Sequence, residues 1–281
     1  MGGIDKLNLT TNQVVDFEFL QAKGYEIKED ERRRNIFKYF CKLEKAELLW
    51  CPHKFSSLTN LNMIWSKIDI NPKYFDSFKS MYEYLCFAYN KEYIPLDSFN
   101  VSRIDICSDI EGLPMDVVHA RLYANQVNRR SFTIYKGQTI YIGANPKIRV
   151  YDKTAEIKYR LRKGYGLTDW EKIVIAEEKQ ITRLEIVIRG YKGTLRDLLE
   201  NPYVLADYFD KLGFYDLGED EAVLNHGGLQ FLLSKVNRKF RTEFDKYKDE
   251  QLLHNIKCGY LESVLDWFGE TTIADIEGVP F

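Results

Sequence analysis

The chain has 281 residues, of which 45% are hydrophobic and 29% charged, and it contains only 7 prolines. This is the composition of a globular protein and excludes extensive disorder, while the length predicts one large domain or two packed domains. The net charge of −2 argues against a protein that coats nucleic acid nonspecifically.

Cysteine usage and hydropathy indicate the compartment. The five cysteines form no CxxC pair, which argues against a disulfide framework and a cysteine zinc site and favours a reducing compartment. No apolar run approaches the length that spans a membrane, and the N-terminus lacks the pattern of a signal peptide. We therefore expect a cytoplasmic protein without a membrane partner.

The N-terminal part of the chain shows weak strand patterns followed by a helix. Apolar and polar residues alternate over Asn12–Leu20 and Ile36–Leu43, which predicts two half-buried strands separated by the charged loop Lys28–Arg34. Apolar residues recur at helical spacing over Pro72–Tyr89, and Pro72 suits the first turn of a helix. A loose β-β-α unit is predicted here.

After Pro95 the patterns become clearer and follow the order β-α-β-β-β-α-β-α. The predicted strands are Val101–Cys107, Ser131–Tyr135, Gln138–Ile142, Lys147–Tyr151 and Thr182–Arg189. The predicted helices are Pro114–Asn128, Lys153–Leu161 and Thr194–Phe209, with Thr194 as the N-cap of the last. This order predicts an α+β fold with a mostly antiparallel sheet and helices on one face.

We expect two structurally related α+β halves, residues 1–95 and 96–215, and a helical C-terminal segment, residues 216–281. Amphipathic helices are predicted after Gly227, and they would form a dimer interface or bind DNA.

Positive charge is concentrated in the middle of the chain. The segment Arg129–Lys192 contains 15 Lys and Arg against 7 Asp and Glu, whereas the whole chain has a net charge of −2. A basic segment within an acidic chain indicates a localised site for a polyanion. A solvated charged surface would give the same pattern.

Alternation along three predicted strands places polar residues on one face and apolar residues on the other. The polar faces carry Lys147, Arg149 and Tyr151 on one strand, Arg103, Asp105 and Asp109 on another, and Arg183 and Glu185 on the third. If the strands are neighbours, these faces merge. Asp105 and Glu185 are then candidate ligands of Mg²⁺ or Mn²⁺, with Asp109 or Asp152 completing the shell.

Tyr151 ends the basic strand and directly precedes Asp152 and Lys153. A tyrosine beside a metal can attack a phosphodiester and form a covalent 5′-phosphotyrosine. A phenol has a pKa of about 10 in water and therefore needs a nearby cation or base, a role open to Lys153. Arg149 and Arg183 would hold neighbouring phosphates.

A purely structural interpretation of the same residues stays open. Tyr151 would then be an ordinary strand-end residue, and Arg103–Asp105 and Arg183–Glu185 would be salt bridges with no metal present.

Three ordered motifs carry a resemblance to a known family. RIDICSD at residues 103–109, YIGANPKIRVYDKTAE at 141–156 and TRLEIVIR at 182–189 resemble the replication initiation factor family, the Rep_trans-type rolling-circle initiators of plasmids and phages, which are related to relaxases. The match covers Val101–Asp210 well and Asn12–Asn90 only in general layout. The histidine pair of the wider relaxase class is missing.

The resemblance implies a metal-dependent enzyme that nicks single-stranded or hairpin origin DNA and rejoins it. It makes Tyr151 the nucleophile and Lys153 its companion, Asp105 and Glu185 the metal ligands, and Asp109 and Asp152 further ligands. The expected DNA-binding residues are Lys147, Arg149, Arg183, Arg103, Arg129 and Arg130. It also implies two related sheet units in a saddle-like arrangement, often dimeric, and a host helicase as a possible partner.

Two alternatives remain from the sequence. One is a non-catalytic DNA-binding regulator or accessory protein, in which Tyr151 only stacks on a base. The other is a metal-requiring hydrolase that uses water and forms no protein–DNA adduct.

Overall fold

The structure is a computed structural model that describes residues 2–29, 37–55, 62–124, 132–135, 139–216, 246–269 and 271–277. The chain divides into two compact units. The N-terminal unit consists of Ile4–Asp105, Arg189–Pro202 and Val264–Phe281, and the central unit of Met1–Gly3, Ile106–Ile188 and Tyr203–Ser263. Strand β6 (Asn100–Glu111) and helix α10 (Glu250–Phe268) contribute residues to both units.

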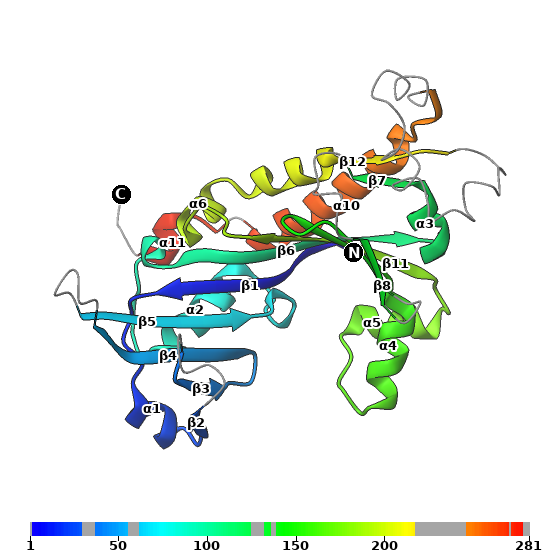
Figure 1. The fold of residues 1–281 in the computed structure, drawn as a ribbon. Coiled ribbons are helices and arrows are strands. Elements are labelled where there is room, and N and C mark those ends of the chain that lie inside the picture. Colours follow the sequence, from blue (N-terminus) through cyan, green and yellow to red (C-terminus); the bar gives the residue numbers. More distant parts are fainter. Residues whose placement is uncertain are drawn as a thin grey trace. The chain divides into compact units, whose positions relative to one another are not determined.

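The N-terminal unit contains an antiparallel sheet in the order β1-β5-β4-β3-β2 (Figure 1). Its strands are β1 (Gly3–Thr11), β2 (Ile27–Glu29), β3 (Tyr39–Lys42), β4 (Ala46–Phe55) and β5 (Asn62–Ile70). Its helices are α1 (Phe17–Ala22), α2 (Phe78–Ala88), α6 (Leu195–Glu200) and α11 (Ile273–Glu277), with short 3-10 turns at Pro72–Tyr74 and Leu96–Ser98.

The strand predicted over Asn12–Leu20 is wrong, because β1 ends at Thr11 and helix α1 begins at Phe17. The Asp16 carboxylate accepts a hydrogen bond from the Phe19 backbone N–H at 2.9 Å and thereby caps α1. The helix predicted over Pro72–Tyr89 is confirmed for Phe78–Ala88, where Ser77 and Ser80 form a capping box.

The central unit contains the strand order β6-β11-β10-β9-β8. Its further strands are β8 (Phe132–Tyr135), β9 (Thr139–Ile142), β10 (Lys147–Asp152) and β11 (Ile181–Arg189), and β7 (Leu122–Ala124) pairs separately with β12 (Leu212–Phe214). Its helices are α3 (Met115–Arg121), α4 (Lys153–Arg162) and α5 (Asp169–Ala176), followed by a 3-10 segment at Pro202–Lys211. The pairs β10/β11, β9/β10 and β8/β9 are all antiparallel.

The two units share one strand order. Leaving aside the separate pair β7/β12, the first strand in each unit is followed in the sheet by the last one, and the remaining strands follow in reverse chain order. The α+β class with mostly antiparallel strand pairing is therefore confirmed. The predicted order β-α-β-β-β-α-β-α is also present, with β7 and α5 as additions.

Several predicted elements differ in extent or lie outside the described residues. The helix predicted over Pro114–Asn128 ends at Arg121, and the one predicted over Thr194–Phe209 is divided into α6 and a 3-10 segment. The charged loop after Lys28 and the helices predicted directly after Gly227 fall largely outside the described residues.

Helices α4 and α5 are fastened to the central sheet by a small apolar core. Ile157 of α4, Val174 of α5 and Ile181 of β11 are buried together, with Trp170 and Leu167 packed against them. The Thr154 hydroxyl donates to the Lys179 carbonyl at 2.8 Å and accepts from the Ile181 N–H at 2.9 Å. The helical hairpin α4–α5 is thus fixed beside the end of β10.

Among the described helices, none combines the length and the apolar character needed to cross a membrane.

Candidate functional site

The antiparallel register of β10 and β11 places the predicted polar residues on one face of the central sheet. Arg149 lies opposite Glu185, and Tyr151 lies opposite Arg183. Since directly opposite residues of an antiparallel pair point to the same side, Tyr151 and Arg183 are immediate neighbours. On the other side of β10, Arg149 lies opposite Tyr141 of β9.

The carboxylates near this face are paired with arginines. Arg149 donates to Glu185 Oε1 at 2.6 Å, and the Glu185 side chain is only 1% exposed. Arg183 donates from Nε and Nη2 to the two oxygens of Asp109, at 2.7 and 2.9 Å, and both side chains are buried. The predicted salt bridge between Arg183 and Glu185 is wrong, because Arg183 pairs with Asp109 and Glu185 pairs with Arg149.

Arg183 keeps its positive charge although it is buried. Burial alone would lower the pKa of the Arg183 guanidinium, but Cys107 and the charge and hydrogen bonds of Asp109 raise that pKa well above its usual value, with a contribution from Tyr151. Arg183 is consequently a permanent cation beside the Tyr151 phenol. A cation in this position can stabilise a phenolate or a phosphate.

Asp105 is paired with an arginine of its own strand, β6. Arg103 donates to both Asp105 oxygens, with Nε–Oδ1 at 2.7 Å, and Asp105 is 1% exposed. Arg103 and Asp105 belong to the N-terminal unit, whereas Glu185, Asp109 and Asp152 belong to the central unit.

The predicted ligands of the central unit, Asp109, Asp152 and Glu185, do not form a group that fits a metal ion. No group of three or more His, Cys, Asp or Glu side chains that could hold a metal occurs among the described residues. Asp105, Glu185 and Asp109 each accept hydrogen bonds from an arginine, and Asp152 has a different role. Carboxylate oxygens are nevertheless the donors that Mg²⁺ and Mn²⁺ prefer.

Asp152 and Lys153 both organise the start of α4. Asp152 is the N-cap, and its Oδ1 accepts from the Ala155 N–H at 2.8 Å. Lys153 is buried and donates to Glu156 Oε2 at 2.6 Å, with Glu171 Oε1 at 3.7 Å. These contacts direct Lys153 to the carboxylates of the helical hairpin, and Lys153 is not among the residues that line the neighbouring cavity.

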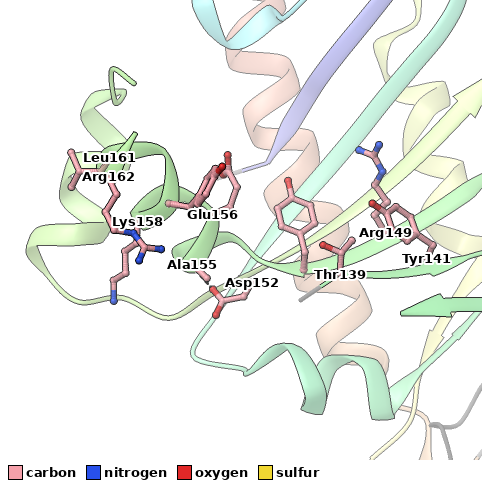
Figure 2. Close-up of a pocket in the computed structure, with 11 residues that line it drawn as sticks. Thr139, Tyr141, Arg149, Asp152, Ala155, Glu156, Lys158, Leu161 and Arg162 are labelled. Atoms are coloured by element: carbon pink, nitrogen blue, oxygen red, sulfur yellow. Dashed lines mark hydrogen bonds between the residues drawn. The ribbon is translucent and has the colours of Figure 1, made fainter. Parts of the chain in front are cut away.

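A cavity of about 860 Å³ opens between the polar strand face and α4. Figure 2 shows its labelled residues in two groups, one on the strands and one on the helix. The strand group comprises Thr139, Tyr141, Arg149, Tyr151 and Asp152, and the helix group comprises Ala155, Glu156, Lys158, Tyr159, Leu161 and Arg162.

The strand wall of the cavity combines cations with an aromatic ring. Lys147 Nζ lies 5.4 Å and Arg149 Cζ 5.8 Å from the centre of the Tyr141 ring. These distances are within the range of cation–π interactions. Arg149 and Tyr151, which line the cavity, and Lys147 alternate along β10 and belong to the polar face that the sequence predicted.

The helix wall was missed from the sequence. Lys158, Tyr159 and Arg162 line the cavity, and their spacing along α4 puts them on one helical face. The basic composition of Lys153–Arg162 was visible, but the direction of that face depends on which residues of α4 are buried. Arg129 and Arg130, predicted to bind DNA, lie outside the described residues.

Comparison of the chain with protein-family models, with curated proteins and with solved structures found no match. The resemblance to rolling-circle initiators therefore rests on the three sequence motifs alone.

Proposed function

We propose that this protein is a rolling-circle replication initiator that nicks and rejoins single-stranded origin DNA through Tyr151. The single observation that carries the proposal is the placement of Tyr151 in the cavity, directly opposite the permanently charged Arg183. The three motifs of the family resemblance contain Tyr151, Arg183 and the carboxylates that pair with the arginines of this face.

In the proposed nicking step the Tyr151 oxygen attacks the phosphorus of one phosphodiester. A bond forms between that oxygen and phosphorus, and the bond from phosphorus to the 3′ oxygen breaks. The phenolic proton passes to solvent, and the leaving oxygen takes up a proton to become a free 3′-OH. Rejoining reverses these changes, so the covalent intermediate conserves the energy of the phosphodiester.

The surrounding residues position and stabilise charge in this reaction. Arg183, held by Asp109, does not line the cavity, but it lies opposite Tyr151, where its charge can favour the phenolate. Arg149 is held by Glu185 on the same face and can contact a neighbouring phosphate. Asp152 starts α4 directly after Tyr151 and so limits the freedom of the nucleophile.

The requirement for Mg²⁺ or Mn²⁺ remains a prediction of the family resemblance. Because no group of three or more His, Cys, Asp or Glu side chains that could hold a metal occurs among the described residues, no step above is routed through a metal. Omitting the metal and adding EDTA tests this requirement separately from the identity of the nucleophile.

A labelled single-stranded DNA assay tests the proposal, with a substrate pool that includes the origin region of the parent element. We expect a protein–DNA band that survives denaturant and is absent with Tyr151→Phe. An undiminished adduct in Tyr151→Phe would contradict the assignment of the nucleophile. Cleavage without an adduct would point to a hydrolase in which water is the nucleophile.

A second candidate function is a DNA-binding regulator or accessory protein without catalysis. It is favoured by one observation, that Asp105, Asp109 and Glu185 are all paired with arginines while Lys153 is paired with glutamates. This candidate predicts salt-sensitive DNA binding that is indifferent to EDTA, with no adduct on any part of the parent element.

A further inference from the structure

Helix α4 presents one face to the cavity and another to the core. Among the α4 residues that line the cavity, Ala155, Lys158, Tyr159 and Arg162 have separations of three, four and seven residues and form one helical stripe, and Glu156 and Leu161 line the cavity on either side of it. Lys153, Thr154 and Ile157 are buried on the other side. The cavity stripe is thus fixed in direction by the burial of the rest of the helix.

The cations on this stripe differ from the ion-paired cations nearby. Arg149, Lys153, Arg160 and Arg183 each have a carboxylate within hydrogen-bond distance. Within the described part of the chain, Lys158 and Arg162 form no ion pair, although both line the cavity. Glu156 of α4 also lines the cavity, but its carboxylate is paired with Lys153 and Arg160. Lys158 and Arg162, four residues apart, therefore leave the stripe with an excess of positive charge for a polyanion.

An aromatic ring lies on the same stripe and remains accessible. Tyr159 is 53% exposed, and Lys163 Nζ lies 5.9 Å from the centre of its ring. On the strand wall of the cavity, Tyr141 packs against Lys147 and Arg149. Exposed rings combined with cations are the usual elements of a surface that binds single-stranded nucleic acid, in which bases stack on rings and phosphates contact the cations.

We propose that the α4 stripe binds a nucleotide that flanks the scissile phosphate of single-stranded DNA. Its base stacks on Tyr159, and Lys158 and Arg162 contact its phosphates. This subsite rests on the proposed function, since it takes Tyr151, which lines the same cavity, as the point of attack. It restricts the substrate to unpaired DNA, because a base inside a duplex has no free face for the Tyr159 ring.

The experiment measures binding separately from nicking. The full-length chain carries Tyr151→Phe throughout, and fluorescence anisotropy follows a labelled oligo-dT of about 12 nucleotides, a length in the range of known single-strand sites. The test variants are Tyr159→Ala and the double variant Lys158→Ala/Arg162→Ala. Tyr165→Ala and Lys172→Ala are matched controls, because these residues are 62% and 64% exposed and do not line the cavity.

We expect Tyr159→Ala to weaken binding about 5- to 150-fold, the range for loss of one stacked base. The double variant should lower the slope of log K against log salt by about 1.4, since each lost phosphate contact contributes about 0.7 for a single strand. Both controls should bind like the parent. A circular dichroism spectrum checks that each variant is folded.

Two results would overturn the subsite. One is unchanged affinity and salt slope in both test variants, and the other is tighter binding of a duplex of the same length than of the single strand. Failure of the proposed function has a different signature, in which the chain with Tyr151 intact forms no covalent adduct while the α4 variants still lose affinity.

Discussion

The two units of the molecule share a strand order but differ in what joins two equivalent strands. In the N-terminal unit residues 56–61 connect β4 to β5, whereas in the central unit residues 153–180, with helices α4 and α5, connect β10 to β11. The candidate nucleophile, Tyr151, lies two residues before this helical connection, and the helix wall of the cavity belongs to the connection. The strand order common to both units fixes which residues of neighbouring strands lie opposite each other. The α4–α5 hairpin, found in the central unit, adds the helix wall of the cavity.

The ion pairs on strands β1 and β5 of the N-terminal unit also differ from the Arg183–Asp109 pair of the central unit. In the N-terminal unit, Lys67 Nζ and Lys6 Nζ lie 2.7 and 3.7 Å from Asp69 oxygens, and all three side chains are partly exposed. In the central unit, Arg183 and Asp109 form a buried pair with two hydrogen bonds. A buried, doubly bonded arginine has a fixed position, which a partly exposed lysine lacks.

The largest expected effect is on adduct yield, and it compares a tyrosine of the central unit with one of the N-terminal unit. Tyr151→Phe should lower covalent adduct formation about 10³-fold or more, since the attacking oxygen is removed. Tyr74→Phe is the matched change in the N-terminal unit, where Tyr74 is 45% exposed, and it should leave the adduct yield unchanged. Quantitative denaturing gels measure both. Equal loss in the two variants would break the assignment of the site to the central unit.

The ion pairs give the next effect. Asp109→Ala should lower the free energy of unfolding by about 3–5 kcal/mol, because it leaves the buried Arg183 charge without its partner. Lys67→Ala in the N-terminal unit should cost about 1 kcal/mol or less, since its pair with Asp69 is partly exposed. Urea denaturation of both variants measures the difference. A comparable cost for the two would contradict the contrast between buried and exposed pairs.

A third effect tests how the helical hairpin is held. Glu171 is buried, and although burial tends to raise its pKa, the Thr168 N–H, Arg160 and Lys153 together lower that pKa below its usual value of 4.5. A carboxylate with a lowered folded pKa adds stability above its unfolded pKa and loses it as the pH falls through the folded value.

Glu171→Gln should therefore cost about 2 kcal/mol at pH 7, the scale of hydrogen bonds to a charged group. The gap from the parent should shrink as the pH is lowered below about 4.5, measured by urea denaturation at several pH values. Asp16→Asn in the N-terminal unit is an exposed companion case, because the hydrogen bonds from the Phe19 N–H and from Asn90 also lower the pKa of Asp16 while asparagine keeps a capping side chain. A gap that stays constant with pH would show that the charge of Glu171 is not what matters.

The smallest effect concerns Asp152. Asp152→Ala should cost about 1 kcal/mol through loss of the N-cap, and Asp152→Asn should cost much less, because asparagine also caps helices. If capping is the whole role of this residue, Asp152→Asn also keeps the adduct yield. A stable Asp152→Asn protein without adduct would instead reveal a need for the negative charge, as the resemblance implies for a metal ligand.

Alternation along the strands was enough to predict the polar face of the central sheet. Ile148 and Val150 are buried while Arg149 and Tyr151 are half-buried, as the period of two requires. The partners of the charges could not be predicted, because they depend on which strands are neighbours. Glu185 of β11 pairs with Arg149 of β10, and Arg183 of β11 pairs with Asp109 of β6.

The N-terminal unit was predicted less well, and local capping explains part of the error. The sequence Asn12–Leu20 alternates, but the Asp16 cap favours a helix from Phe17. Helix α5 was missed although Thr168 and Glu171 have the spacing of a capping box, and both of its hydrogen bonds are present. Strand β4 contains a proline, which weakens a strand prediction.

The most direct test is to locate the covalent bond itself. The protein is incubated with single-stranded origin DNA, denatured and digested with trypsin and nuclease, and the modified peptide is sequenced by mass spectrometry. We expect nucleotide mass on the peptide 150–153, with the modification at Tyr151. A modification on any other residue, or cleaved DNA with no modified peptide, would contradict the account.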